Sequence, residues 1–75
     1  MARTIVRCNT SALDAQIRLA RWSNSDLARA AGVSKGTIGH LRSGSRDVTT
    51  GVTATAIEKA LRVDPGAIFR ADPAA

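Results

Sequence analysis

The chain has few of the residues on which most catalytic and metal sites depend. Its 75 residues include one histidine, one cysteine (Cys8) and no tyrosine. A lone cysteine cannot form an internal disulfide, which suits a reducing cytoplasm. One histidine, with no cysteine pair and no clustered carboxylates, supplies neither a set of metal ligands nor a nucleophile–base pair. The sequence therefore predicts a protein that is not an enzyme and that needs no metal or cofactor.

Aromatic residues and long apolar runs are also scarce. With one tryptophan and one phenylalanine, the core must be built mainly from Ala, Leu, Ile and Val. The N-terminal segment MARTIVRCN has no long apolar run, which excludes a signal peptide or a membrane span there. A chain of 75 residues is long enough for one globular domain but too short to enclose a substrate cavity. We therefore expect neither a membrane partner nor a small-molecule substrate.

Acidic residues are outnumbered by basic ones. Eleven lysines and arginines against six acids give a formal net charge of +5 and an isoelectric point near 11.2. On so small a surface, this balance favours a polyanionic partner, most often nucleic acid. A soluble basic domain without such a partner would have the same charge, so the charge alone does not decide.

Residues 24–44, NSDLARAAGVSKGTIGHLRSG, contain the most informative pattern of the chain. Counted from Asn24, an alanine stands at place five (Ala28) and a glycine at place nine (Gly32). A small residue allows two helices to cross closely, and glycine suits the sharp turn between them. Large apolar residues follow at places four, ten, fifteen and eighteen, namely Leu27, Val33, Ile38 and Leu41. This is the spacing of a helix-turn-helix, whose second helix enters the DNA major groove.

Local signals place the ends of these two helices. Ser23 with Asp26 forms a capping pattern that starts the first of the pair, which runs to about residue 31. Ser34 caps the second, which runs to about Arg42. Gly44 is suited to a left-handed position at its end.

The segment before the motif predicts an arm and one helix. Residues 4–8 are β-prone but too short for periodicity to decide, so they form either a loose arm or a short strand. Ser11 with Asp14 resembles a capping box and predicts the start of the helix. The helix should bury Leu13, Ile17 and Ala20. Trp22 is expected to pack in the core or at the hinge.

The segment after the motif predicts a loop and two further helices. The loop covers residues 46–50, and a fourth helix covers roughly residues 51–62, with Glu58 at the surface. One face of this helix carries Val52, Ala56, Ile57, Ala60 and Leu61. Asp64 followed by Pro65 predicts a short last helix that ends near residues 68–69. The expected fold class is therefore a compact, all-α, five-helix domain over residues 11–70, between an arm or strand at 1–10 and a flexible tail at 71–75.

On these residues the chain resembles the lambdoid repressor and Cro family of helix-turn-helix regulators, also called the Xre type. The resemblance covers about residues 11–69 and rests on SNSDLARAAGVS, KGTIGHLRSG, TAIEKAL and VDPGAIF. It implies a lambda-repressor-like fold of five helices, binding to operator DNA and, commonly, a symmetric dimer. The richness in alanine and arginine is similar to that of versions from high-GC actinobacteria or their phages, although codon bias alone could produce it.

The resemblance also implies which residues would contact DNA. The cap and first turn of the recognition helix, with one place a turn later, usually face base edges; here these are Ser34, Lys35, Gly36, Thr37 and His40. The positions that usually meet the phosphate backbone are here Asn24, Ser43, Ser45 and Arg46. Arg42 is a further candidate for a phosphate contact, because it lies beside the end of the recognition helix. Many members have a glutamate where this chain has Arg42. The arginine therefore predicts stronger backbone binding and the loss of an internal ion pair.

Two glycines lie on the outward side of the recognition helix. At 100° per residue, Gly36 points almost directly away from the buried side, and Gly39 and His40 lie close to that direction. Each glycine costs a helix interior about 1 kcal/mol relative to alanine. Their presence favours a close approach of the helix backbone to DNA, and drift at weakly selected surface sites is the alternative.

The leading hypothesis is a transcriptional regulator that binds double-stranded DNA specifically, a Cro-like repressor that reads the major groove with residues 34–42. The alternatives are a phage excision or DNA-architecture factor, an antitoxin, or a protein-interaction module on the same fold. One helix reads only a few base pairs, so a homodimer on DNA is expected. It could form around Ile68 and Phe69, or by pairing of residues 4–8 between two chains.

Overall fold

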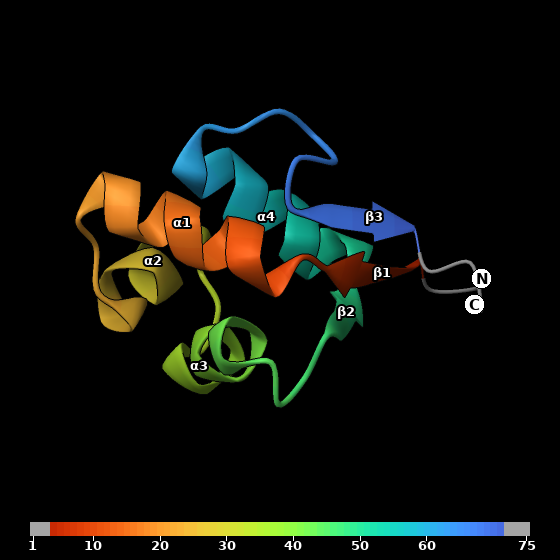
Figure 1. Ribbon diagram of the computed structural model, residues 1–75, viewed down its shortest axis with the longest axis horizontal. Helices are drawn as coiled ribbons and strands as arrows, with labels where there is room; N and C mark the ends of the chain where they lie inside the picture. Colours follow the sequence, from red (N-terminus) through yellow and green to blue (C-terminus); the bar gives the residue numbers. More distant parts are fainter. Residues whose placement is uncertain (1–3, 72–75) are drawn as a thin grey trace.

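Four helices pack around one apolar core in the computed structural model, which describes residues 4–71 (Figure 1). They are α1 (Thr10–Ala20), α2 (Asn24–Ala31), α3 (Lys35–Ser43) and α4 (Gly51–Leu61). The largest fully buried side chains are Leu13, Ile17, Leu27, Ile38, Leu41, Ile57 and Ile68. Aliphatic side chains therefore dominate the core, as the scarcity of aromatic residues predicted.

Three short strands form an antiparallel sheet, so the fold is not all-α as predicted. The strands β1 (Ile5–Cys8), β2 (Val48–Thr50) and β3 (Phe69–Ala71) lie in the order β2-β1-β3. Residues 5–8 are thus a strand and not a loose arm, and the predicted loop 46–50 contains β2. Strands of three or four residues are too short to show a period of two, so the sequence left a strand near residues 4–8 as one of two alternatives and did not predict β2 or β3.

The predicted fifth helix does not form, because residues 64–69 make a turn that leads into β3. The amide of Ala67 donates to the carbonyl oxygen of Asp64 at 3.0 Å. Gly66 has a φ of 88°, a left-handed conformation that a right-handed helix cannot contain. Asp64 and Pro65 therefore begin a turn, and the helix predicted to start there is wrong.

Glu58 of α4 holds this turn in place, and its predicted surface position is wrong. The residue is buried, with 7% of its surface exposed. Its carboxylate oxygen Oε2 accepts the backbone amides of Gly66, Ile68 and Phe69 at 3.1, 3.0 and 3.1 Å. These amides therefore have no need of helical partners. The buried, hydrogen-bonded carboxylate of Glu58 explains why the predicted fifth helix does not form and why Glu58 is not at the surface.

The predicted apolar face of α4 is confirmed in part, because Ile57 is buried and Ala60 and Leu61 are partly buried against the core. The buried residues of this helix are Ala54, Ile57 and Glu58, whereas Val52 is 83% exposed. In α1, Leu13 and Ile17 are buried as predicted, but Ala20 is exposed. Trp22 is half-buried and packs against the core, as expected.

Most helix ends follow their local signals. Ser23 and Asp26 form a complete capping box at α2, and the Ser34 side chain accepts the amide of Thr37 at the start of α3. The left-handed glycine expected after α3 is found, since Gly44 has a φ of 85°. At α1 the prediction was wrong: Asn9 is the N-cap, and its Oδ1 accepts the amide of Ala12.

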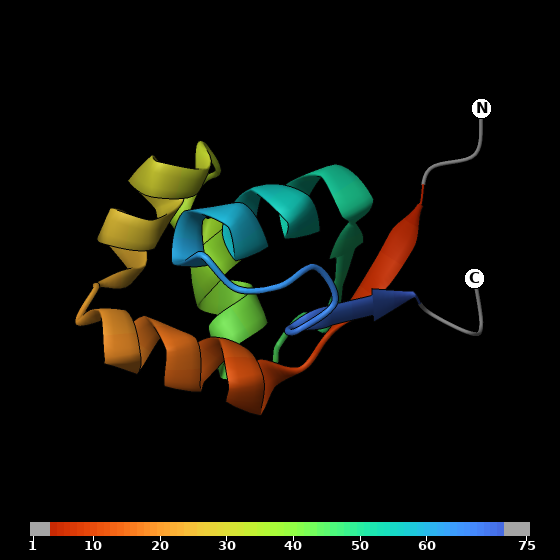
Figure 2. The same ribbon diagram turned by 90° about the horizontal axis from the view of Figure 1, so that it is seen from above.

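Both surfaces predicted for dimerisation lie within the protomer. Ile68 and Phe69 are 1% and 3% exposed because they pack into the core. The strand β1 is the central strand of the sheet, so β2 and β3 already occupy its two edges (Figures 1 and 2). Neither surface can pair with a second copy without opening the fold. The predicted tail lies outside the described residues from residue 72 onward, as do residues 1–3 of the predicted arm.

Candidate nucleic-acid interface

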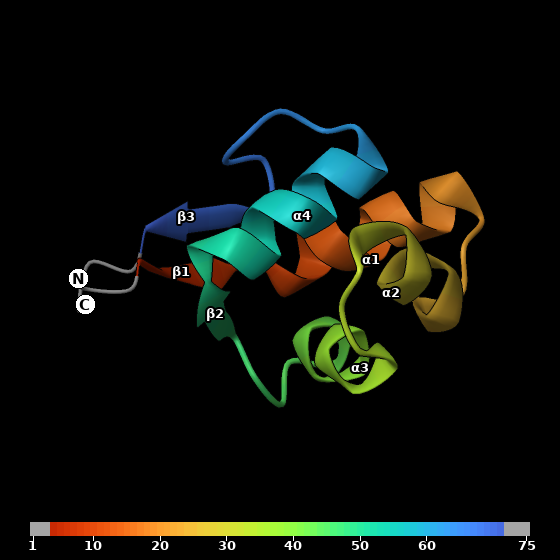
Figure 3. The same ribbon diagram turned by 180° about the vertical axis from the view of Figure 1, so that it is seen from behind.

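The helices α2 and α3 form a helix-turn-helix with the packing that the sequence predicted. Leu27 and Ala28 of α2 are buried, as are Ile38 and Leu41 of α3. Gly32 has a φ of 72° in the turn, and its N–H donates to the carbonyl oxygen of Ala28. In Figures 1 and 3, α3 and the loop after it form the lower side of the molecule, away from the crossing of α1 and α4. The second helix of the motif therefore lies at the surface of the molecule.

The outward side of α3 carries few large side chains near its first turn. Lys35, Gly36 and His40 are exposed, whereas Thr37 and Gly39 are half-buried. A Cβ added at Gly36 would meet no atom within 4 Å. The exposed residue Lys35 is therefore followed by a position at which the surface of α3 is open.

Two of the predicted base-contacting residues, Ser34 and Thr37, form the N-terminal cap of α3. The Ser34 Oγ accepts the amide of Thr37 at 3.1 Å and lies 2.8 Å from the Thr37 Oγ1. Both hydroxyls are thus engaged with each other in the free protein. A hydroxyl can donate and accept at once, so this pair retains capacity for a further partner.

The loop after α3 is tied to the helix through His40. The His40 Nδ1 lies 2.9 Å from the Ser45 Oγ, which in turn lies 3.1 Å from the Ser43 Oγ. The amide of Arg46 donates to the carbonyl oxygen of His40 at 3.1 Å. Within residues 4–71 the Arg46 side chain has no hydrogen bond or ion pair. Four of the predicted site residues, His40, Ser43, Ser45 and Arg46, therefore lie together at the end of α3, and the Arg46 side chain is exposed.

Arg42 faces the interior of the motif. Its Nε donates to Oδ1 of Asp14 in α1 at 2.7 Å, and its Nη1 donates to Oδ1 of Asn24 at the start of α2 at 3.0 Å. The Arg42 and Asp14 side chains are 25% and 34% exposed. The predicted loss of an internal ion pair at this position is therefore wrong, because Arg42 forms one with α1.

Asp14, to which the sequence assigned only a capping role, is a partner of the candidate site residue Arg42. Its other oxygen, Oδ2, accepts from the Arg18 Nε at 2.8 Å. The hydrogen bond from Arg42 is the main cause that lowers the pKa of Asp14, and Arg18 lowers it further. The spacing of Asp14 and Arg18 by four helical residues was a visible signal for their pair. The contact with Arg42 spans two helices, so no local pattern could have shown it.

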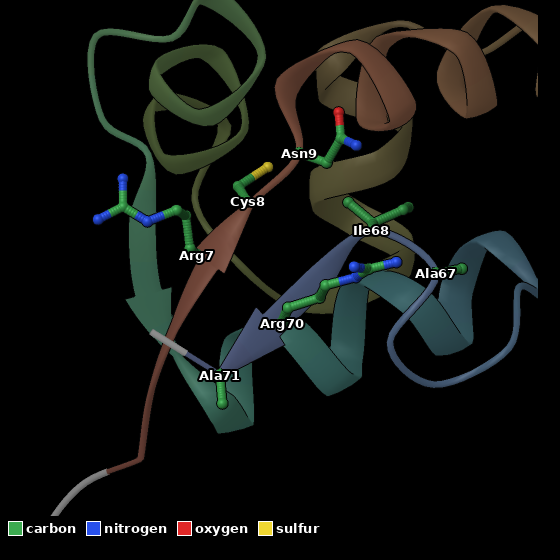
Figure 4. A pocket seen from close by; sticks show the side chains of 7 residues that line it. All are labelled: Arg7, Cys8, Asn9, Ala67, Ile68, Arg70 and Ala71. Atoms are coloured by element: carbon green, nitrogen blue, oxygen red, sulfur yellow. The ribbon is translucent and has the colours of Figure 1, made fainter. Parts of the chain in front are cut away.

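A second feature with basic residues lies on the sheet, apart from α3. Arg7 of β1 and Arg70 of β3 are cross-strand partners, and Arg7 forms an ion pair with Asp47 at 2.7 Å. A hollow of about 370 Å³ lies beside them, lined by Arg7, Cys8, Asn9, Ala67, Ile68, Arg70 and Ala71 (Figure 4). The two guanidinium groups extend in opposite directions in this view, so they do not converge on one ligand position.

Cys8, at the base of this hollow, is buried. Burial, assisted by the negative charge of Asp47, raises the pKa of its thiol to about 11. A thiol in this state is a weak nucleophile at neutral pH. Cys8 is a small packing residue of the core.

Within residues 4–71, no group of three or more His, Cys, Asp or Glu side chains lies together in a way that could hold a metal ion. None of the helices in this part of the chain has the length and apolar content needed to cross a lipid bilayer.

Comparison with known proteins gives one match. A family model described as "Helix-turn-helix" matches residues 15–68, which include all four helices apart from the first turn and a half of α1. No significant match was found among curated proteins or among solved structures.

Proposed function

Because the chain belongs to the Xre/Cro/lambda-repressor-type helix-turn-helix family of DNA-binding regulators, we propose that it is a sequence-specific, Cro-like repressor that reads the DNA major groove with α3. The observation that carries the proposal is the surface of α3. Gly36 leaves open space there, between the exposed side chains of Lys35 and His40. A helix without bulky outward side chains can approach base edges closely.

The proposed base contacts are those of the first turn and of the place one turn later. Lys35 donates to N7 and O6 of a guanine. His40 keeps its Nε2 for DNA, because its Nδ1 is held by Ser45 at 2.9 Å. The full proposed set is Ser34, Lys35, Gly36, Thr37 and His40.

The proposed phosphate contacts border this set. Arg46, whose side chain has no hydrogen bond or ion pair within residues 4–71, supplies a cation, and the hydroxyls of Ser43 and Ser45 belong to the same segment of chain. Asn24 supplies a neutral donor at the start of α2. Arg42, whose guanidinium donates to the Asn24 amide oxygen, completes the proposed set.

We further propose that two copies bind one two-fold-symmetric operator, since one α3 reads only a few base pairs. The interface must lie outside the buried residues Ile68 and Phe69 and outside the central strand β1. Footprint length and binding stoichiometry on the selected site test this part of the proposal.

The experiment that tests the function is selection of bound sequences from random duplex DNA, followed by anisotropy titrations at several salt concentrations. With about six phosphates neutralised, log K should fall with log salt at a slope of roughly −5. Lys35→Ala should relax preference at one or two base pairs by about 1–3 kcal/mol each. Arg46→Ala should weaken binding to all sequences similarly and make the slope shallower by about one.

Two results would contradict the proposal. A flat salt dependence without any selected sequence would point to a protein partner in place of DNA. If Lys35→Ala and Arg46→Ala gave the same pattern of losses across a library of sites, the division between base and phosphate contacts would be wrong.

A further inference from the structure

The guanidinium of Arg42 is committed to partners inside the motif. It donates to Asp14 of α1 at 2.7 Å and to Asn24 of α2 at 3.0 Å, while its own backbone belongs to α3. One side chain thus joins three helices. Its positive charge faces the Asp14 carboxylate, which it shares with Arg18.

This contact fixes the orientation of the Asn24 amide. A guanidinium has only donors, so the amide atom that faces Arg42 must be the oxygen Oδ1. The two N–H groups of Nδ2 then point away from Arg42. Asn24 is the first residue of α2, where the helix dipole favours an anion and Ser23 already caps the amide of Asp26.

Gly39 keeps this donor uncovered. A Cβ added at Gly39 would lie 3.8 Å from the Asn24 Nδ2, and Nδ2 is the closest atom that it would meet. A longer side chain at this position would extend over the amide. Gly39 therefore differs from Gly36, beside which the protein itself places nothing within 4 Å.

We propose that Arg42 is a positioning residue that acts on DNA through Asn24: anchored to α1 by Asp14, it presents the Asn24 Nδ2 to a backbone phosphate, and Gly39 leaves room for that phosphate. The inference rests on the proposed DNA binding. It assigns Arg42 an indirect role, whereas Arg46 neutralises a phosphate directly.

The two arginines should therefore differ in their salt dependence. A cation that neutralises a phosphate releases counterions, so its loss makes the salt slope shallower by about one. Arg42 is already paired with Asp14, so its loss should leave the slope unchanged and weaken binding only as far as the Asn24 contact is lost.

The test measures DNA binding and thermal unfolding of four variants on the selected duplex. Arg42→Met and Asn24→Ala should each weaken binding about five- to tenfold per domain, the value of one hydrogen bond, and the double variant should lose no more than either alone. Arg46→Met should make the slope of log K against log salt shallower by about one, and it serves as the reference for a direct phosphate contact. Lys59→Met, on the exposed side of α4, removes the same charge and should leave binding unchanged.

A fifth variant separates position from stability. Asn24→Asp gives Arg42 a carboxylate partner and places a negative charge in the first turn of α2, so it should melt no lower than wild type. It should nevertheless lose specific binding at least tenfold, because it has no donor and repels the phosphate. This variant keeps the test decisive even where Arg42→Met does not fold.

Two outcomes would overturn the inference. One is a shallower slope for Arg42→Met together with a loss that adds to that of Asn24→Ala, which would make Arg42 a direct contact. The other is specific DNA binding by the Asn24→Asp variant that is as strong as that of wild type. The wild-type titration separates this result from failure of the proposed function, which would show as weak, salt-independent binding of wild type itself.

Discussion

Replacing Glu58 should cost this small domain a large part of its stability. The carboxylate accepts three backbone amides that belong to the turn before β3 and to the start of that strand. Two of these hydrogen bonds, to Ile68 and Phe69, are buried. In Glu58→Ala both amides would lose their partner in a place that water does not reach easily.

The magnitude follows from the number of orphaned groups. A buried donor left without a partner costs about 1–3 kcal/mol, so Glu58→Ala should lose roughly 2–6 kcal/mol. A domain of this size has a free energy of unfolding of roughly 4–11 kcal/mol in total. Glu58→Gln keeps an oxygen acceptor but loses the charge, which predicts an intermediate loss of about 1–3 kcal/mol.

Urea denaturation followed by far-ultraviolet circular dichroism measures these losses, and Lys59→Ala on the same helix is the control. Amide hydrogen exchange should show β3 opening first in Glu58→Gln, before the helices do. The reasoning is refuted if both Glu58 variants unfold within about 0.5 kcal/mol of wild type, the range of an ordinary surface substitution.

Four further predictions concern single residues. Gly36→Ala should stabilise the free domain by up to about 1 kcal/mol, since its Cβ meets no atom, and should weaken specific but not nonspecific binding; paired melts and binding curves check both. Arg62→Gly should raise the melting temperature, because Arg62 ends α4 with a φ of 59° that glycine adopts at lower cost, whereas Arg62→Ala should give no gain. Unfolding free energy should decline as pH falls below about 3.8, because the lowered pKa of Asp14 means that the ionised form stabilises the fold until it is protonated; acid titrations of Asp14→Asn should show a smaller decline. Alkylation of Cys8 at pH 8 should be slow in the folded protein and fast in denaturant, since burial raises the pKa of its thiol to about 11; equal rates would contradict that burial.

The parts of the fold that the sequence predicted correctly are those with short-range causes. The capping box of Ser23 and Asp26 involves residues three apart, and the left-handed glycines at 32 and 44 answer a local need of the backbone. The spacing of Ile38 and Leu41 reports one face of one helix. These features depend only on residues that are close together in the sequence.

The incorrect predictions concern residues whose partners lie far away in the sequence. Asp14 has the local features of a capping residue, but a partner on α3 uses its carboxylate. Glu58 has the spacing of a surface residue, but the amides that bury it come from a segment ten residues further on. In both cases a polar side chain serves a partner that only the folded chain brings near. The role of Asn24 as an oriented donor depends on the same long-range contact of Arg42.

The antiparallel pairing of β1 with β3 has a practical consequence for the covalent chain. Val6 lies opposite Ala71, so the two ends of the described chain leave the sheet as neighbours, on the side away from α3 (Figures 1 and 2). A short peptide linker could therefore join them into a closed ring without disturbing α3. Backbone cyclisation removes conformations from the unfolded chain, and for a loop of this length the gain is of the order of 4 kcal/mol in the chain-entropy treatment. The domain is thus well suited to circularisation as a route to a heat-resistant form.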